Sequence, residues 1–188
     1  QYITINNQGV AAALVSAPQL DLFVSVNPIS GSVFRGGTLQ SSVDVSLLSG
    51  VSQSSNFSVS GLPADAGASF SPVSCTPACS SVMTISTAVS TPVGVTAVIV
   101  TITSGSLTKT ATYTLTVNAP TVPDAPNNLT ATPGVSQITL DWQAPVFNGG
   151  SAITNYKVYR GTVSGGETFY ADAGNVLAYT NTGLTNGT

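Results

Sequence analysis

The chain carries, at residues 95–117, the stretch VTAVIVTITSGSLTKTATYTLTV. Apolar and polar residues alternate over residues 95–103 and again over residues 110–117, on either side of the triplet Ser104-Gly105-Ser106. A period of two places alternate side chains on opposite faces of an extended backbone, so each run predicts a half-buried β-strand. The Gly and Ser residues between the runs supply a turn. This stretch therefore predicts β-structure.

The same alternation continues towards the N-terminus and predicts a whole domain. Further runs occur at residues 22–26, 42–47, 57–60 and 82–86, and the chain between them is broken by Asn27-Pro28, Gly36-Gly37, Gly61-Leu62-Pro63 and Thr91-Pro92. Seven or so short strands with turns every 8–12 residues are typical of an antiparallel β-sandwich of about 100 residues. We place this sandwich at residues 19–118. The predicted fold class is all-β, because no segment has a helical period.

The composition excludes several classes of function. Of 188 residues only 6% are charged, there is no His, and Glu167 is the one Glu, whereas about 25% of residues are charged in ordinary soluble domains. Most acid–base, triad and zinc chemistry lacks its residues here, so the sequence predicts a protein that is not an enzyme and needs no cofactor. Four basic residues cannot form a surface that binds nucleic acid.

The hydropathy of the chain does not indicate a membrane span. The longest purely apolar run covers residues 10–15, whereas a spanning helix needs about 18 or more apolar residues. A chain with few charges, rich in predicted strands and with two cysteines, indicates an extracellular or cell-surface protein.

A second all-β pattern follows the short linker at residues 119–122. Its motifs are PDAPNNLTA at 123–131, QITLDW at 137–142, NGGSAITNYKVYR at 148–160 and GLTNGT at 183–188. These residues resemble a fibronectin type III domain: its opening strand, its strand B with the core tryptophan (Trp142), its strand C, and the corner that leads into strand F. Residues 19–118 more loosely resemble the Ig-like repeats of secreted and surface proteins, through Gly61-Leu62-Pro63 and Phe70-Ser71-Pro72.

The fibronectin resemblance implies seven strands, and residues 123–188 match the first five. Residues 1–18, QYITINNQGVAAALVSAP, resemble the missing strands F and G, with two apolar runs around a turn at residues 6–9. When they are written after Thr188, Tyr2 falls where the family's tyrosine opens strand F. The expected domains are therefore an F–G hairpin at 1–18, an Ig-like sandwich at 19–118, and a fibronectin domain at 123–188 that lacks F and G. The alternative is that residues 1–18 are a flexible leader or an extension of the first strand.

The expected geometry favours completion by another copy. The linker reaches about 14 Å, whereas the two ends of a sandwich lie roughly 35–40 Å apart. Head-to-tail completion does not close on itself and yields a filament. We therefore expect a structural subunit of an extracellular filament, whose partners are copies of itself, joined by donated strands or as one continuous repeat chain. The expected assembly interface comprises Tyr2, Ile3, Ile5, Val10, Leu14 and Val15 on one copy, and Trp142, Tyr156, Val158 and Leu184 on the next.

A second hypothesis is a non-catalytic spacer or adhesion module of a larger secreted protein, such as a polysaccharide-degrading enzyme or an adhesin. Surface glycans are possible partners in that case, because exposed aromatic side chains of the fibronectin-like part can contact carbohydrate. The aromatic residues in question are Tyr156, Tyr159, Phe169, Tyr170 and Tyr179.

The remaining candidate sites are small. Cys75 and Cys79 predict a structural disulfide that closes a five-residue loop and contributes about 2 kcal/mol; a metal or redox site is not expected there. Possible N-glycosylation sequons begin at Asn56, Asn128 and Asn186, and we expect Asn186 to be unmodified or to face outward because it lies at the proposed junction. The acidic residues are scattered, show no calcium-loop spacing, and read as solvated single charges.

Overall fold

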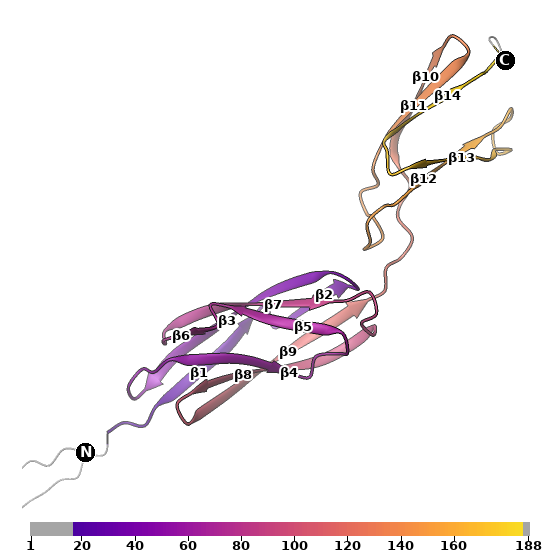
Figure 1. Cartoon of the computed structure of the whole chain (residues 1–188). Coiled ribbons are helices and arrows are strands. Elements are labelled where there is room, and N and C mark those ends of the chain that lie inside the picture. The colour runs from indigo at the N-terminus through magenta and orange to yellow at the C-terminus, as the bar shows by residue number, and fades with distance from the viewer. Residues whose placement is uncertain (1–16, 186–188) are drawn as a thin grey trace, which may run out of the picture. The chain divides into compact units, whose positions relative to one another are not determined.

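The computed structural model describes residues 17–185 (Figure 1). The described residues form fourteen strands and no helix, so the all-β prediction is confirmed. The chain divides into two compact units, and the boundary along the sequence lies between Asn118 and Ala119. Unit 1 denotes described residues 17–118 and unit 2 denotes described residues 119–185.

Unit 1 is a two-sheet sandwich. One sheet has the order β1 (Asp21–Asn27), β3 (Thr38–Ser49), β7 (Cys79–Thr87), β5 (Ala66–Ser71). The other has the order β2 (Ser30–Phe34), β9 (Leu107–Asn118), β8 (Gly94–Ser104), β4 (Ser55–Ser60), β6 (Ser74–Cys75). The stretch at 95–117 forms the β8–β9 hairpin, whose antiparallel pairing runs from Gly94↔Val117 to Ser104↔Leu107. The pairing of β2 with β9 is parallel.

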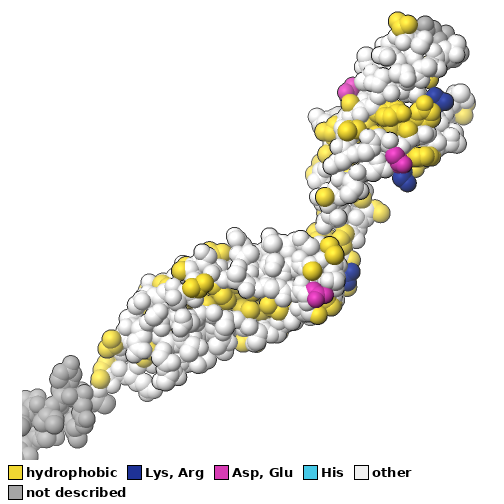
Figure 2. All heavy atoms as spheres, in the orientation of Figure 1, with side chains coloured by type: hydrophobic (Ala, Val, Ile, Leu, Met, Phe, Trp, Pro, Cys, Tyr) yellow, Lys and Arg dark blue, Asp and Glu magenta, His cyan; other side chains and the backbone are white. Residues whose placement is uncertain are grey.

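The core of unit 1 follows from the alternation. Val98, Val100 and Ile102 of β8 are fully buried, and their neighbours in sequence face the surface or the edge of the sheet. They pack against alternate residues of the opposite sheet, such as Met83 and Ile85, in one continuous apolar cluster. Burial of a Val or Ile side chain contributes about 1.5–3 kcal/mol, so this cluster supplies the main driving force for folding of the unit. Few charged side chains are visible on the face shown in Figure 2.

Three strands of unit 1, β2, β5 and β6, fall outside the predicted runs. Their residues are mostly Gly, Ala and Ser, which have little intrinsic preference for strands. They become strands because each pairs with a longer neighbour: β2 with β9, β5 with β7, and β6 with β4. Tertiary pairing overrides local propensity at these edges.

Unit 2 contains five strands in two sheets. A three-stranded sheet has the order β10 (Asn127–Gly134), β11 (Gln137–Gln143), β14 (Ala178–Thr182), and a two-stranded sheet contains β12 (Tyr156–Arg160) and β13 (Thr168–Gly174). Trp142 of β11 and Tyr156 and Val158 of β12 are its buried apolar residues.

The two units differ in the pairing of the strand that crosses from the first sheet to the second. In unit 1, β4 follows β3, crosses to the second sheet and pairs there with β8, which in turn pairs with β9. In unit 2, β12 follows β11 and crosses in the same way, but it pairs only with β13 among the described residues. The edge of β12 that corresponds to the β8 side of β4 is therefore open within residues 17–185.

Candidate functional site

A cavity of about 370 Å³ lies in unit 2 between the two sheets. Its walls come from the segment that leads into β10, from β10 and β11, and from β12. The lining residues are Ala125, Pro126, Leu129, Leu140, Trp142, Tyr156, Lys157, Val158 and Tyr159. Most of these side chains are apolar, none is acidic, and Lys157 is the single cation among them. We call this cavity, together with the open edge of β12, the acceptor groove.

Two aromatic residues line the acceptor groove from opposite sheets. The rings of Trp142 and Tyr156 meet edge to face, with centroids 5.4 Å apart and an interplanar angle of 60°. The indole Nε1 of Trp142 is buried and has no hydrogen-bond partner among the described residues. A buried donor without an acceptor costs about 1–3 kcal/mol. An occupant that brings a carbonyl or hydroxyl oxygen to this nitrogen removes that cost.

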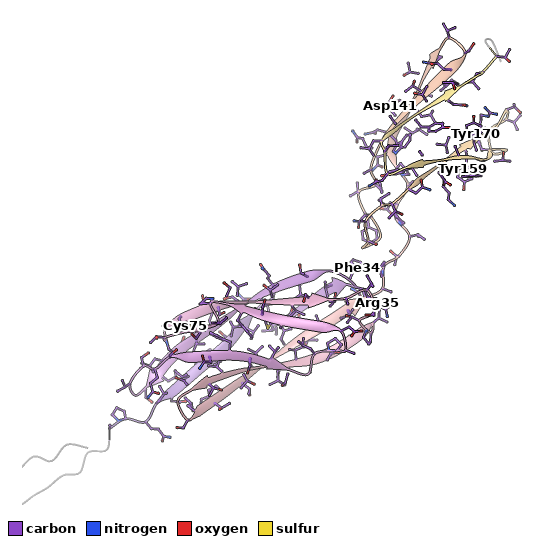
Figure 3. All side chains as sticks on the ribbon, in the orientation of Figure 1. Phe34, Arg35, Cys75, Asp141, Tyr159 and Tyr170 are labelled. Carbon is purple, nitrogen blue, oxygen red and sulfur yellow. A yellow bond between two sulfur atoms is a disulfide. The ribbon has the colours of Figure 1, made fainter. Side chains whose placement is uncertain are left out.

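The side of unit 2 where β13 and β14 meet is closed. The Tyr170 hydroxyl donates a hydrogen bond of 2.9 Å to Asn181 Oδ1, and the Tyr170 ring lies 6.5 Å from that of Tyr179. The Arg160 guanidinium lies 4.3 Å from the centre of the Tyr170 ring, close enough for a cation–π contact. Figure 3 marks Tyr170 in unit 2. The contacts of Tyr170 with Asn181 and Tyr179 join the two sheets along one side, and the Arg160 contact lies within the β12–β13 sheet. On the other side β10 and β12 are not paired with each other.

The high exposure of Leu129 shows that the open side of unit 2 lacks a covering strand within the described residues. Leu129 lies on β10 and lines the acceptor groove, yet 64% of its surface is exposed. Its neighbour across the cavity, β12, also presents the backbone groups of one edge without a strand partner within the described residues. Exposed strand edges are templates for pairing with another chain. The groove thus combines an apolar wall with a row of backbone hydrogen-bonding groups, which is the chemistry that binds an added β-strand.

The predicted interface residues divide into three groups. Trp142, Tyr156 and Val158 come together in the acceptor groove. Leu184 is half-buried outside its lining, and its N–H donates a 3.0 Å hydrogen bond to Ser136 O. The residues expected on the donating side lie outside the described residues: Tyr2, Ile3, Ile5, Val10, Leu14 and Val15. The interface as a whole stays a prediction.

The predicted interface missed six of the lining residues: Ala125, Pro126, Leu129, Leu140, Lys157 and Tyr159. The signal for Leu140 was present in the alternation of residues 137–142, because Leu140 and Trp142 lie two positions apart on one face of β11. The signal for Leu129 was its place within the opening strand. Ala125 and Pro126 belong to the same motif at 123–131, but they precede β10 and reach the cavity through the path of the backbone, which the motif does not specify.

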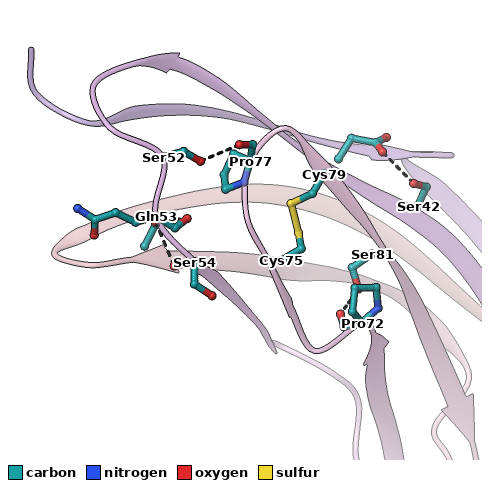
Figure 4. The surroundings of a disulfide bond; sticks show 11 residues. Ser42, Ser52, Gln53, Ser54, Pro72, Cys75, Pro77, Cys79 and Ser81 are labelled. Atoms are coloured by element: carbon teal, nitrogen blue, oxygen red, sulfur yellow. Dashed lines mark hydrogen bonds between the residues drawn. A yellow bond between two sulfur atoms is a disulfide. The ribbon is translucent and has the colours of Figure 1, made fainter.

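The disulfide prediction is confirmed. Cys75 of β6 and Cys79 of β7 are bonded, with their Cα atoms 6.1 Å apart (Figure 4). The sequon residues Asn56 and Asn128 are exposed, and Asn186 lies outside the described residues. Within residues 17–185 no group of three His, Cys, Asp or Glu side chains could hold a metal ion, and no helix is long and apolar enough to cross a membrane.

One acidic residue has a perturbed pKa. Asp21 at the start of β1 forms an ion pair of 2.6 Å with Lys109 of β9. The hydrogen bond from Lys109 lowers the pKa of the Asp21 carboxyl below its ordinary value, and the charge of Lys109 and the backbone N–H of Leu22 act in the same direction. This pair joins the two sheets of unit 1 at the surface.

Comparisons with known proteins give weak likenesses. No protein family matches the sequence, and no curated protein matches it. Among solved structures, domains 5–6 of the S-layer protein SbsC show 16% identity and a TM-score of 0.41 over 84% of this chain and 85% of that chain. Domains 4 and 5 of SbsC show 22% identity and a TM-score of 0.40 over 53% of each chain. Domains A168–A170 of titin show 14% identity and a TM-score of 0.34 over 89% of this chain and 56% of that chain.

A family 123 glycoside hydrolase from Clostridium perfringens is a further likeness, at 12% identity and a TM-score of 0.42 over 54% of this chain and 28% of that chain. The chain spans little more than half the length of the SbsC domain 4–5 and titin structures. All these TM-scores are below 0.5, so none of these likenesses indicates a function.

Proposed function

We propose that the chain is the structural repeat unit of an extracellular filament. The acceptor groove of one copy takes residues 1–18 of another copy as two strands, the first of them beside β12. The protein then acts as a non-catalytic building block. The observation that carries this proposal is the open edge of β12 over an apolar cavity that contains Trp142.

The chemistry of residues 1–18 suits the acceptor groove. They contain no charged side chain, and the groove walls are largely apolar. Their alternating residues Ile3 and Ile5 fall on one face of an extended strand. A strand beside β12 also supplies the backbone carbonyl oxygens that the open edge requires. Backbone pairing provides affinity in such strand additions, and the side-chain pockets provide specificity.

The proposed contact joins two different surfaces of the chain, and this predicts an open polymer. The donated segment precedes unit 1, and the acceptor groove lies in unit 2, so the two halves of the contact are different surfaces. A contact between different surfaces propagates head to tail and gives a filament unless the rotation closes a ring. The same interface forms in a continuous repeat chain, in which the strands come from the adjoining repeat of one polypeptide.

The mass of the filament subunit under denaturing conditions distinguishes these two forms. Donated strands predict about 18.9 kDa. A continuous repeat chain predicts a far larger mass.

A peptide experiment tests the interface itself. The full chain is dissociated and allowed to reassemble with an excess of free peptide of residues 1–18, and filament length is measured by electron microscopy. The peptide is expected to fill acceptor grooves and shorten the filaments, with a change in the fluorescence of Trp142, the single tryptophan of the chain. A matched peptide with Ile3→Asp and Ile5→Asp is expected to do neither, because it would bury two charges. Unchanged filament length and fluorescence with the native peptide would overturn the proposal.

A further inference from the structure

The loops at one end of unit 1 carry exposed apolar side chains. At this end β3 ends at Ser49, β1 begins at Asp21, which pairs with Ser49, and β8 turns into β9. Leu48, Val51 and Val73 are 61%, 74% and 73% exposed here. The loops at residues 50–54 and 72–78 contain no charged residue. We call Leu48, Val51 and Val73 the apolar rim.

The loops beneath the apolar rim are tied to one another. The Cys75–Cys79 disulfide joins β6 to β7, and Ser52 Oγ donates a 2.7 Å hydrogen bond to Pro77 O inside the loop that the disulfide closes (Figure 4). On one side Ser81 Oγ donates to Pro72 O over 2.6 Å. On the other, Ser104 Oγ lies 3.3 Å from both Gln53 O and Ser54 O. The rim is therefore carried on a cross-linked surface rather than on separate loops.

The segment that precedes β1 is held at this same end. Ser49 Oγ donates a 2.7 Å hydrogen bond to Gln19 O. Gly50 packs so closely that a Cβ there would lie 2.5 Å from Leu20 Cα. From Val15, the last of the residues expected in the interface, the chain reaches Leu20 in five residues and spans at most about 18 Å. A copy that accepts residues 1–18 must therefore lie within that distance of Leu20, which packs against Gly50 next to Val51 of the apolar rim.

We propose that the apolar rim is a second contact surface, and that its occupant is unit 2 of the copy that accepts residues 1–18. This inference rests on the proposed donation of those residues. The rim buries exposed valine and leucine surface against the accepting copy, which stabilises the junction by the hydrophobic effect. The disulfide and the serine hydrogen bonds hold the loops in the bound arrangement in advance, so less conformational freedom is lost on contact. This assigns the small disulfide to assembly, beyond its local effect on one loop.

The test compares two kinds of charged variant in the full chain. Val51→Asp/Val73→Asp places charges on the apolar rim. Val89→Asp is the matched control, because Val89 is 80% exposed and follows β7 at the opposite end of unit 1. The rim variant is expected to raise the concentration needed for filament formation by about tenfold or more. The control is expected to stay within about twofold of the unmodified chain, and all three proteins are expected to unfold at similar temperatures because the substituted positions are exposed.

Capture of free peptide 1–18 separates failure of this inference from failure of the proposed function. The rim variant is expected to bind the peptide, read by Trp142 fluorescence, as tightly as the unmodified chain, because the groove is unchanged. If the rim variant assembles like the unmodified chain, or if Val89→Asp impairs assembly equally, the inference is wrong while the proposed function stands. If no chain binds the peptide, the proposed function is wrong. A Cys75→Ser/Cys79→Ser variant is expected to weaken assembly in the same direction while unit 1 stays folded, and unchanged assembly would remove the role given to the disulfide.

Discussion

The side chain of Tyr113 lies fully buried in unit 1, with its hydroxyl directly against Gly31 of β2. The hydroxyl has no hydrogen-bond partner among the described residues. The position of β2 beside β9 thus depends on a residue without a side chain at 31, since a Cβ there would overlap Tyr113 Oη. Gly31 thus sets how closely the edge strand β2 approaches the core of unit 1.

Gly31→Ala is expected to destabilise unit 1 by about 1–3 kcal/mol, because overpacking forces Tyr113 or β2 to move. Tyr113→Phe is expected to be neutral or stabilising, since it removes an unpartnered buried hydroxyl, and it should relieve most of the cost of Gly31→Ala in the double variant. Thermal or urea unfolding measures all three. The matched control is Gly67→Ala on exposed β5, where the nearest atom to a new Cβ is Ser86 Oγ at 3.4 Å. Equal losses at positions 31 and 67 would contradict the explanation.

The ion pair between Asp21 and Lys109 gives unit 1 a defined pH dependence. The pKa of Asp21 is lower in the folded chain than its ordinary value, so the pair stabilises the fold above the ordinary Asp pKa of about 3.9. That stability is lost as the pH falls through the lower folded pKa. The melting temperature of Asp21→Asn is therefore expected to depend less on pH below about 4 than that of the unmodified chain. Parallel curves for the two proteins would show that the pair contributes nothing.

Strands that carry a strong alternating pattern could be predicted from the sequence, and those that depend on a neighbour could not. The runs at 95–103 and 110–117 correspond to β8 and β9. Their alternating apolar residues form one buried face of each strand, and this pattern is visible in the sequence without knowledge of the neighbouring strands. The two residues of β6 form a strand only because they pair with β4. In unit 2, Trp142, Tyr156 and Val158 could be assigned to the acceptor groove from sequence. The contributions of Ala125 and Pro126 could not, since they depend on the path of the chain before β10.

Hydrogen exchange of β12 tests the element that the proposal places at the centre of the junction. In the dissociated chain, amides on the open edge of β12 are expected to exchange quickly, because no strand of residues 17–185 pairs with them. In filaments they are expected to slow by about tenfold or more. The amides of β8 serve as the control, because β8 pairs with β9 and β4 and should be protected in both states. Equal exchange of β12 in the two states would contradict strand addition at this edge.

At the scale of the whole molecule, the scarcity of charge determines how assembly responds to solution conditions. Lys157 is the single charged residue that lines the cavity of the acceptor groove, and residues 1–18 contain none. There is no His, so no imidazole titrates near neutral pH. Assembly must then depend on apolar burial and backbone pairing, which salt screens little.

Filament formation is expected to change by less than about threefold in critical concentration between about 0.05 and 0.5 M NaCl, because screening acts on exposed charges. Light scattering across a dilution series measures this concentration. The denaturant urea, which solvates both apolar and peptide groups, is the matched comparison and is expected to raise it steeply. A strong loss of assembly in NaCl would show that ion pairs outside the described contacts control the junction.

The parallel pairing of β2 with β9 has a mechanical consequence. Five residue pairs, from Ser30↔Thr114 to Phe34↔Asn118, run side by side in the same direction. A tensile load that enters at the start of β1 and leaves at the end of β9 pulls these two strands past each other along their length. Their hydrogen bonds are then sheared together, whereas in a peeling geometry they would break one after another. The short edge strand β2, weak by composition, is thus placed where it resists stretching of unit 1.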